Sequence, residues 1–379
     1  MYKVTGANDC NRLFPSIKFR IDQVWVDQDA LNETLTALIL ERVGSARVLV
    51  GDEVIPARRA LEMKPDPFRH GKKVIRLLKH KGAFIKPCPG TKEYVCCGLQ
   101  ILHIGQGCPM DCRYCALQVY FNRPVLEVFV NTDDLRTELD SHLKADPNRF
   151  HRLCTGEFTD SLALEPLTGL AASLVQFLAG RTNASLELKT KTDLIEPLLD
   201  LNPVSRVVVG FSVNSRSVRS SEERGAASLE RRLKAAATVQ DRGYRLAFHF
   251  DPIIPLPGWA SEYNEVVDAI FRSVDRDAVA WISLGVLRFV PELKETARSR
   301  FGSVPYFHDG FLRGLDGKQR LHVDRRIAAY RHMAERIRRH APDVRIYLCM
   351  ESPYAWEKAL DIRMESNEQL SAYLDAGVV

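Results

Sequence analysis

The stretch Gly105-Gln106-Gly107-Cys108-Pro109-Met110-Asp111-Cys112-Arg113-Tyr114-Cys115 carries three cysteines at C-x3-C-x2-C spacing. Three thiolates can hold three irons of a [4Fe–4S] cluster, whereas a redox ferredoxin site normally uses four cysteines. The fourth iron of such a cluster is left open to bind a small molecule. We therefore predict that Cys108, Cys112 and Cys115 are the metal ligands of a cluster with one open iron.

A cluster of this kind is typical of radical S-adenosylmethionine (SAM) enzymes. In these enzymes the open iron chelates the amino and carboxylate groups of SAM, and an electron from the cluster cleaves SAM to a 5′-deoxyadenosyl radical. The cofactor carries the hard chemistry, and the protein supplies position and excludes water. The motif thus predicts two cofactors, a [4Fe–4S] cluster and SAM, and an electron donor such as flavodoxin or ferredoxin as a partner.

A zinc site is the competing interpretation of the same cysteines. It would combine three of them with a fourth ligand such as Cys96, Cys97 or His103. Zinc knuckles usually come as two paired C-x2-C halves, however. Buried structural cysteines are a third interpretation, and a loop punctuated by Gly and Pro does not favour it, because such a loop is poor core-building sequence. A zinc-stabilised nucleic-acid-binding protein without catalysis is therefore kept as an alternative, and the spacing favours iron–sulfur.

Composition and targeting signals are those of an ordinary cytoplasmic protein. Of the 379 residues, 45% are hydrophobic and 27% are charged, as in soluble globular proteins. Residues 1–14 have no apolar core, so we expect no secretory signal. The longest stretch without Asp, Glu, Lys or Arg, residues 94–110, is too short and too mixed to cross a bilayer. Nine cysteines without a secretory signal favour metal or redox use over disulfides. We expect the cytoplasm and no membrane partner.

The net charge of +5 is unevenly distributed along the chain. Residues 57–86 hold ten Lys and Arg against two acids, and residues 311–340 hold nine against three. Local excesses of this size attract polyanions, although a solvated helix face would give the same pattern. On a suspected radical enzyme we take the two stretches to indicate a nucleic acid as a partner. Four residues are candidate phosphate contacts: Arg298, Arg300, Lys318 and Arg320.

From about residue 96 onward, apolar runs typical of strands alternate with amphipathic helical stretches. The expected strands are 99–104, 125–130, 152–155, 185–189, 206–211, 245–250 and 280–285. The expected helices are 133–143, 164–179, 193–199, 228–241 and 260–274. Such alternation predicts a parallel sheet covered by helices. The fold class is therefore α/β, a partial (β/α)6 TIM-type radical SAM barrel with N- and C-terminal α+β extensions.

Three domains follow from this pattern: an N-terminal basic region over residues 1–95, a core barrel over residues 96–290, and a C-terminal extension over residues 291–379 with DNA contacts. In the first we expect a helix over 29–42 and a basic helix over 71–81. In the last we expect a helix over 325–340 and a strand over 345–349.

Polar residues follow several predicted strands, at the end of a barrel where functional groups gather. Glu157 or Asp160 suits the ammonium of SAM, and Lys191 suits its carboxylate. Ser212 and Asn214 are short hydrogen-bonding groups that suit ribose hydroxyls. Each residue alone has a structural explanation. Their arrival at the same end of successive strands makes them a set of candidate cofactor-binding residues.

The segment Gly107-Cys108-x3-Cys112-Arg113-Tyr114-Cys115-Ala116-Leu117-Gln118 resembles the cluster loop of the spore photoproduct lyase family, which reads C-x3-C-H-Y-C-Y-L-Q. The similarity extends over about residues 99–290. It includes Thr159-Asp160, Thr190-Lys191, Phe211-Ser212-Val213-Asn214, Asp251-Pro252-Ile253 and Gly258-Trp259-x3-Tyr263.

The resemblance implies a DNA-repair lyase that abstracts hydrogen from a thymine dimer lesion. It implies SAM contacts from Asp160, Lys191, Ser212 and the backbone of Asp251, and it places Tyr114 in the cluster loop. We take Tyr114 both as a cofactor-binding and as a catalytic candidate.

Two departures from the family pattern concern hydrogen transfer. The family's hydrogen-donating cysteine aligns with Phe158, and its partner tyrosine aligns with Ala116. Candidate replacements are Cys349, Cys154 and the Cys96–Cys97 pair. Cys349 is preferred because it ends a predicted strand beside polar residues. We predict a radical SAM enzyme that repairs a UV photolesion or a modified base in DNA; the alternative is a radical SAM enzyme with a non-DNA substrate.

Overall fold

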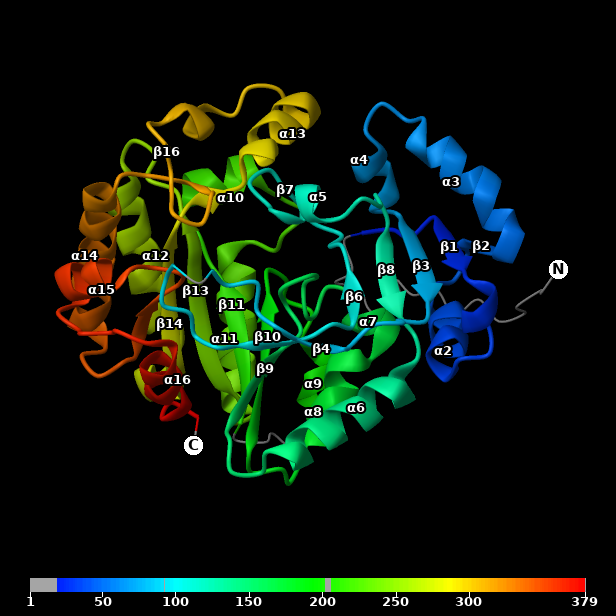
Figure 1. The fold of residues 1–379 in the computed structure, drawn as a ribbon, viewed down its shortest axis with the longest axis horizontal. Helices are drawn as coiled ribbons and strands as arrows, with labels where there is room; N and C mark the ends of the chain where they lie inside the picture. Colours follow the sequence, from blue (N-terminus) through cyan, green and yellow to red (C-terminus); the bar gives the residue numbers. More distant parts are fainter. Residues whose placement is uncertain (1–18, 92, 202–205, 379) are drawn as a thin grey trace.

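A curled, mostly parallel sheet dominates the computed structural model, which describes residues 19–91, 93–201 and 206–378 (Figure 1). Within these residues the sheet has eight strands in the order β18-β14-β13-β11-β10-β9-β5-β4, and only the β4–β5 pair is antiparallel. The strands are β4 (Ile85–Pro87), β5 (Gln100–Leu102), β9 (His151–Cys154), β10 (Ala184–Thr190), β11 (Val207–Ser212), β13 (Arg245–Ile253), β14 (Val279–Val286) and β18 (Ile346–Leu348).

The central strands are apolar because both of their faces are covered. All eight residues of β14 are buried, and in β11 only the last residue, Ser212, is partly exposed. Continuous apolar strands of this kind are what a parallel sheet under helices requires. The covering helices follow the strands in sequence: α6 (Thr132–Ala145), α8 (Leu170–Leu178), α9 (Glu196–Leu199), α11 (Leu229–Asp241) and α12 (Trp259–Ser273). The predicted α/β partial barrel is confirmed.

One predicted helix is interrupted. The stretch 164–179 forms two helices, α7 (Glu165–Thr168) and α8, with Gly169 between them at φ 62°. That left-handed conformation is readily adopted by glycine and ends α7. The Glu165 carboxylate then accepts hydrogen bonds from the backbone N–H groups of Ala171 and Ala172, at 2.8 and 2.9 Å, and caps the start of α8.

A second sheet corrects two predictions. Its order is β2-β1-β3-β8-β6, and its strands are β1 (Gln23–Val26), β2 (Arg47–Val50), β3 (Val74–Leu78), β6 (Gly105–Gln106) and β8 (Leu126–Phe129). The stretch 125–130, expected as a barrel strand, instead pairs with β3 and β6 in this sheet. The basic helix expected over 71–81 is wrong. This stretch forms strand β3 instead, with Val74, Ile75 and Leu77 buried. Burial of these apolar side chains outweighs the flanking lysines, which can stay in solvent in either conformation.

The remaining elements flank the two sheets. Before the barrel lie η1 (Gln28–Ala30), α2 (Thr34–Arg42), η2 (Gly51–Glu53), α3 (Val54–Glu62) and α4 (Pro67–Gly71). Around the cluster loop and the later strands lie β7 (Asp111–Cys112), α5 (Leu117–Tyr120), α10 (Arg216–Glu222), β12 (Glu223–Arg224) and η3 (Arg276–Ala278). The C-terminal part adds β15 (Arg288–Phe289), α13 (Pro291–Phe301), η4 (Pro305–His308), β16 (Leu312–Arg313), β17 (Gln319–Arg320), α14 (Val323–His340), α15 (Pro353–Leu360) and α16 (Asn367–Asp375).

The C-terminal stretch contributes to the main sheet. Its predicted strand over 345–349 is β18, which pairs with β14 at the sheet edge, and its predicted helix over 325–340 is α14. Figure 1 shows α12 and α14 on the outer side of the curled sheet. None of the helices within the described residues combines the length and apolar character needed to cross a lipid bilayer. The three-domain division stays a prediction.

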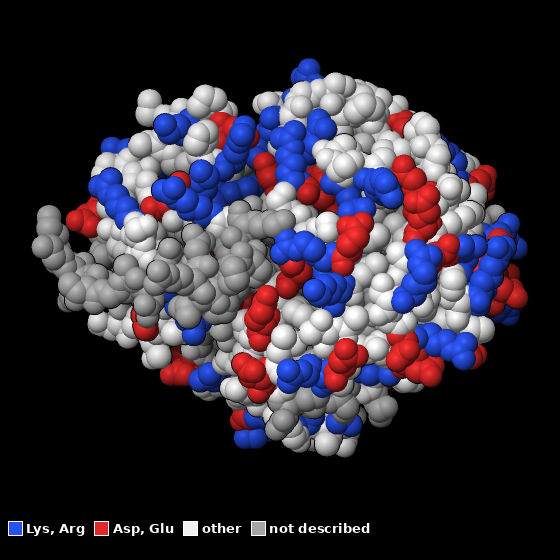
Figure 2. Space-filling view, turned by 180° about the vertical axis from the view of Figure 1, so that it is seen from behind, with Lys and Arg blue, Asp and Glu red and all other residues white. Residues whose placement is uncertain are grey.

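The face turned away in Figure 1 carries a notch at its upper edge, and Figure 2 shows Lys and Arg side chains on both sides of it. In Figure 1 that edge lies between α3–α4 and α13. The two sides are joined where Arg300 of α13 pairs with Asp66, the residue that caps α4, at 3.0 Å.

Candidate active site

A cavity of about 320 Å³ lies at the C-terminal ends of the parallel strands, where β10, β11, β13, β14 and β18 meet the cysteine loop. Cavities of this size accommodate small-molecule ligands and cofactors. Eleven of the residues singled out in the sequence line it: Cys108, Cys112, Tyr114, Cys115, Glu157, Asp160, Lys191, Ser212, Asp251, Lys318 and Cys349. Five others are absent from its lining: Cys154, Asn214, Arg298, Arg300 and Arg320.

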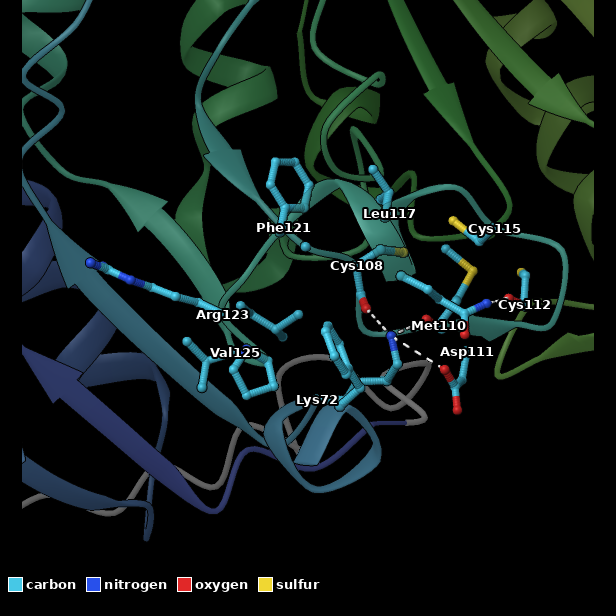
Figure 3. Close-up of a pocket in the computed structure, with 15 residues that line it drawn as sticks. Lys72, Cys108, Met110, Asp111, Cys112, Cys115, Leu117, Phe121, Arg123 and Val125 are labelled. Carbon is cyan, nitrogen blue, oxygen red and sulfur yellow. Dashed lines mark hydrogen bonds and ion pairs between the residues drawn. The ribbon is translucent and has the colours of Figure 1, made fainter. Parts of the chain in front are cut away.

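The cysteine loop is held in place by a lysine from the N-terminal region. Lys72 Nζ donates hydrogen bonds to the backbone oxygens of Cys108 and Met110, at 2.8 and 2.6 Å, and lies 3.6 Å from the Asp111 carboxylate (Figure 3). Gly107, at φ 83°, starts the turn in a conformation that favours glycine. The loop is therefore preorganised by contacts outside itself.

Arg300 holds the same loop from the opposite end of the chain. Its guanidinium donates to Asp66 and Asp111 at 3.0 Å, and to Gln118 Oε1 at 2.6 Å. Gln118 in turn donates to the carbonyl oxygen of Cys112 at 2.9 Å. The Arg300 side chain is only 6% exposed, so it is a structural support of the cysteine loop.

The loop forms a wall between two cavities. Cys108, Cys112 and Cys115 line the large inner cavity and also a small outer one of about 40 Å³. Figure 3 shows Lys72, Phe121 and Arg123 around this outer cavity, with the three cysteines along one side of it. The thiols are thereby reached from both sides of the loop.

The donor set fits an iron–sulfur cluster. Three thiols from one loop face a common cavity, and burial raises the pKa of Cys108 to about 12. A buried thiol of that kind stays protonated without a metal and releases its proton when a metal binds. Among the described residues no three His, Cys, Asp or Glu converge on a point that would suit a single metal ion. Cys108, Cys112 and Cys115 would hold the cluster beside the inner cavity that they line.

Asp160 organises the turn after β9. Its carboxylate accepts from the Thr190 hydroxyl and from the backbone N–H groups of Lys191, Leu162 and Ala163, all at 2.8 to 3.0 Å. Burial raises the pKa of Asp160, and these N–H groups act against that rise. The carboxylate therefore fixes the start of the Lys191 segment at the cavity rim.

Two lysines reach the cavity from the end of β10. Lys189 Nζ donates to Glu157 Oε1 at 2.6 Å, and both residues line the cavity. Lys191 Nζ lies 5.9 Å from the centre of the Tyr114 ring. The Tyr114 hydroxyl donates to Glu223 at 2.5 Å, and Glu223 pairs with the buried Arg232. The tyrosine hydroxyl is thus engaged in the protein, and its ring contributes to the cavity wall.

Ser212 and Asn214 separate in the structure. Ser212 lines the cavity, as the sequence predicts. Asn214 is 1% exposed, donates to the Pro252 carbonyl oxygen at 3.0 Å, and accepts from the Tyr263 hydroxyl. Asn214 therefore supports the turn after β13. It does not line the cavity, so it does not contact a ligand there.

Asp251, Arg288 and Cys349 form a cluster on the cavity wall. The Arg288 guanidinium donates to both Asp251 oxygens, at 3.2 and 3.1 Å, and to Cys349 Sγ at 3.2 Å. Burial would raise the pKa of Asp251, but the Arg288 charge lowers it overall. Burial raises the pKa of Cys349. Arg288 was missed in the sequence, since no motif ties it to the strand ends.

The second candidate thiol, Cys154, lies behind the wall. It is 0% exposed, and its sulfur accepts a hydrogen bond from the Gly156 N–H at 3.2 Å. Phe158, aligned with the family's donor cysteine, packs its ring 4.8 Å from His103 and 6.0 Å from Phe121. The position is thus part of an aromatic cluster.

Two of the four predicted phosphate contacts are wrong, because their side chains are buried in the protein. Arg320 is 2% exposed and pairs with the fully buried Asp316 carboxylate at 2.7 Å, and Arg300 supports the cysteine loop. Internal carboxylates already pair with both guanidinium groups, so neither is a free phosphate ligand. Lys318 lines the cavity and lies 3.6 Å from Asp316, whereas Arg298 is exposed beside Glu295.

A buried network at the cavity floor was also missed. Glu187 Oε1 lies 2.7 Å from His249 Nε2, and His249 Nδ1 lies 2.9 Å from the Ser283 hydroxyl. Gly210 leaves room for this contact, because a Cβ there would sit 2.8 Å from His249 Nε2. Three different strands supply the network, so no local spacing in the sequence announces it.

Comparison with known proteins identifies a family for this chain. A family model described as "Spore photoproduct lyase" matches residues 93–301, more than half of the chain. The spore photoproduct lyase of Geobacillus sp. (strain Y412MC61) is 28% identical over 204 residues, which are 52% of this chain and 59% of that protein. The Bacillus subtilis (strain 168) lyase is 26% identical over 172 residues, 45% of this chain and 50% of that protein. The match thus spans about half of each relative's length.

The fold agrees with a solved structure. A spore photoproduct lyase variant with bound AdoMet and dinucleoside spore photoproduct superposes with a TM-score of 0.78 at 21% identity, covering 87% of this chain and 99% of that one. At this identity the likeness supports the fold alone.

Proposed function

This chain belongs to the spore photoproduct lyase family, and from that premise we propose that it is a radical SAM enzyme that repairs a UV photolesion or another modified base in DNA. One observation carries the proposal. The three cysteines of one preorganised loop share a cavity with Lys191, Ser212 and Asp251, the positions that the family resemblance assigns to SAM. A solved relative holds AdoMet together with a dinucleoside lesion.

The chain's own residues have separate tasks in this proposal. Cys108, Cys112 and Cys115 hold the cluster, and Lys72 and Arg300 fix their loop. When bound, the cluster and SAM supply a 5′-deoxyadenosyl radical that abstracts a hydrogen atom from the substrate. Binding and exclusion of water fall to the cavity residues.

SAM would be held by charges of both signs. Lys191 would take its carboxylate, Glu157 its ammonium group, and Ser212 a ribose hydroxyl, while Asp160 positions the Lys191 segment and Tyr114 forms part of the wall. The backbone at Asp251 would complete the site. Glu157 is shared with Lys189, so a ligand ammonium would join an existing ion pair.

Cys349 is the proposed hydrogen-atom donor to the substrate radical. It lines the cavity, whereas Cys154 lies behind the wall, so only Cys349 of the two meets a bound ligand. Arg288 and Asp251 fix its sulfur.

DNA would bind by its phosphates to exposed cations and by the lesion to the cavity. The notch in Figure 2 has Lys and Arg on both sides, and the exposed basic residues of the segments that flank it, residues 54–71 and α13, include Arg58, Arg59, Lys64, Arg69 and Arg298. Leu312 and Leu315, 56% and 77% exposed, lie on and beside β16, in the same small sheet as β15, whose Arg288 and Phe289 line the cavity. Apolar side chains in such a place suit contact with unstacked bases, and a damaged base unstacks at low cost.

The remaining partner is an electron donor such as flavodoxin or ferredoxin, in the cytoplasm. The outer cavity supports this part, because the loop cysteines line it with Lys72 and Arg123 beside them. Such a surface suits an acidic protein that must approach the cluster closely.

The test is anaerobic reconstitution with iron and sulfide, followed by mass spectrometry of SAM cleavage products. We expect 5′-deoxyadenosine and repaired bases at least tenfold above background only with an oligonucleotide that carries the lesion. Cys349→Ala should abolish repair and leave SAM cleavage, and Cys154→Ala should change neither. Equal turnover with undamaged oligonucleotide would contradict the DNA proposal.

A radical SAM enzyme acting on a non-DNA substrate is the second candidate. Phe158 and its aromatic neighbours favour it, because the family's hydrogen donor is replaced by a ring that has no transferable hydrogen. SAM cleavage stimulated by a peptide or a small molecule, and not by lesion DNA, would support this candidate.

A further inference from the structure

Three cysteines outside the cluster loop, Cys88, Cys96 and Cys97, gather beside the same cavity, and Cys88 and Cys97 line it. Cys88 follows β4, and Cys96 and Cys97 precede β5, its antiparallel partner. The Cys88 N–H donates to the Leu99 carbonyl oxygen at 2.9 Å, which brings the two ends of the connecting loop together. Cys88 and Cys97 line the cavity, so these thiols meet whatever enters it.

The three cysteines of this trio, Cys88, Cys96 and Cys97, are close neighbours. A Cβ at Gly90 would lie 2.5 Å from Cys96 Sγ and 3.8 Å from the Cys88 carbonyl oxygen, and the Cys96 thiol influences the pKa of both Cys88 and Cys97. Gly90 makes room for the Cys96 thiol, because a Cβ at that position would also lie 3.3 Å from Cys96 Cβ. Any larger residue at position 90 would displace the central sulfur, so the loop is shaped around it.

The trio is held by the C-terminal part of the chain. The Cys96 N–H donates to Asn367 Oδ1 at 2.7 Å, and the Cys97 carbonyl oxygen accepts from the buried Arg152. The neighbouring Val95 N–H donates to the Glu351 carbonyl oxygen at 2.9 Å. Anchors on both sides of the thiols fix their relative positions, and this favours reaction between them over reaction with distant cysteines.

Simple packing does not account for this arrangement. An isolated cysteine in a core acts as a small hydrophobe, but Cys88 and Cys96 are both partly exposed and lie in one short loop beside Gly90. Adjacent, partly accessible thiols are the usual setting for disulfide exchange.

We propose that Cys88 and Cys96 are a reversible dithiol–disulfide couple that is oxidised by low-molecular-weight disulfides entering the cavity. The Cys88 thiolate attacks one sulfur of the small disulfide, forming a mixed disulfide and releasing one thiol. The Cys96 thiol then loses its proton and attacks the Cys88 sulfur, forming the Cys88–Cys96 bond and releasing the second thiol. Two protein thiols are oxidised, and one small disulfide is reduced to two thiols.

The order of attack follows from the environments of the sulfurs. The hydrogen bond from Cys96 lowers the pKa of Cys88 and partly offsets the burial that raises it. The hydrogen bond to Cys96 and complete burial raise the pKa of Cys97 well above its ordinary value. Cys88 is also partly exposed and lines the cavity, whereas Cys97 is buried, so an incoming disulfide is attacked first by Cys88 and Cys97 takes no part in the exchange. The couple stands independently of the proposed DNA repair.

Peptide mapping tests the couple directly. The full, metal-free chain is equilibrated with oxidised glutathione under argon, its free thiols are alkylated, and it is digested with trypsin. Cleavage after Lys81, Lys92 and Arg113 puts Cys88 in residues 82–92 and Cys96 in residues 93–113. A Cys88–Cys96 bond therefore links two peptides. We expect the linked pair in most molecules, and its loss on treatment with dithiothreitol.

Matched variants separate this bond from other pairings. Cys96→Ser and Cys88→Ser should each lower the linked pair at least tenfold, Cys97→Ser and Cys154→Ser should leave it, and Gly90→Ala should lower it severalfold by displacing the Cys96 sulfur. Circular dichroism must show that each variant keeps the wild-type fold. If only one of Cys88→Ser and Cys96→Ser folds, that variant alone is enough for the comparison with wild type. No linked pair in the wild type, or an undiminished pair in Cys96→Ser, would overturn the proposal. Neither readout depends on SAM cleavage, so failure here leaves the proposed function intact.

Discussion

Two sets of cysteines lie at one cavity, which all of their members except Cys96 line, and the two sets are built in different ways. The loop set, Cys108, Cys112 and Cys115, comes from eight consecutive residues whose turn is held by Lys72 and Arg300. The wall set, defined as Cys88, Cys96, Cys97 and Cys349, comes from three segments that meet through β4–β5 pairing and through β18. Regular spacing marks the first set, and only the folded chain assembles the second.

The difference teaches which chemistry each set can serve. A loop with local spacing presents three thiols to one cavity, which suits a metal cluster. In the wall set, the trio's cysteines are close neighbours and Cys349 contacts Arg288, which suits exchange or hydrogen transfer. The four predictions that follow separate the two sets, starting from the largest effect.

Removing one loop cysteine should remove the cluster. We expect Cys112→Ala to lower the iron content after anaerobic reconstitution from about four irons per chain to below about one, because a cube held by two thiolates is lost. Cys96→Ala is the matched control from the wall set and should keep the wild-type iron and sulfide content. Equal iron loss in both variants would erase the distinction between the sets.

Arg300 should be essential to the loop set through its ion pairs. Arg300→Met removes the guanidinium from the Asp66 and Asp111 carboxylates in a site where the arginine is 6% exposed, and leaves Asp111 with the more distant Lys72. We expect the free energy of unfolding to fall by about 3–5 kcal/mol in urea titrations, with weaker cluster retention. Arg298→Met, on the same helix but 69% exposed, should cost less than about 1 kcal/mol. Similar losses for the two variants would contradict a structural role for Arg300.

Arg152 should support the wall set in the same manner. Its side chain is 4% exposed, pairs with Asp375 at 2.7 Å and donates to the Cys97 carbonyl oxygen. We expect Arg152→Met to cost about 2–3 kcal/mol, since a buried carbonyl oxygen and a carboxylate lose their donor. Alkylation of Cys96 and Cys97 should become several times faster while iron binding by the loop set persists. Unchanged alkylation rates would show that the trio is held by other contacts.

Glu187, in the buried network at the cavity floor, should make the stability of the protein depend on pH in the acid range. Burial alone would raise the pKa of Glu187, but the charges of His249 and Lys189 and the hydrogen bond with His249 lower it to about 2. A carboxyl whose folded pKa lies below its unfolded value stabilises the fold above the unfolded pKa and loses that contribution as pH falls through the folded one. Glu187→Gln should therefore be less stable than wild type by on the order of 2 kcal/mol at pH 7.

This stability difference between wild type and Glu187→Gln should shrink between about pH 5 and pH 2, the window that the lowered pKa sets. Chemical denaturation at several pH values measures it. Glu295→Gln, a substitution at a carboxyl that is 64% exposed, is the control and should show no such window. A difference that stays constant with pH would mean that Glu187 acts through packing.

The main features of the fold were available in the sequence because they are local. Strand–helix alternation indicated the barrel, and the serine before α11 caps it by accepting from the Arg231 N–H, as its position suggests. The strand β3 was mistaken for a helix, since its flanking lysines mimic a solvated helix face. The strand β8 was assigned to the wrong sheet, because the sequence of a strand does not determine which other strand it pairs with.

The candidate site likewise has a part that local sequence predicts and a part that depends on contacts between distant residues. Cys108, Cys112 and Cys115 could be identified as ligands from spacing alone, because a short turn fixes their separation whatever surrounds it. The contacts that decide the rest join residues far apart in the chain: Arg300 with Asp111, Arg288 with Cys349, and Cys88 with Cys96. Burial and pairing turned two predicted phosphate contacts into internal supports. Such long-range pairs are set by packing of whole elements against one another, and that is a property of the folded chain alone.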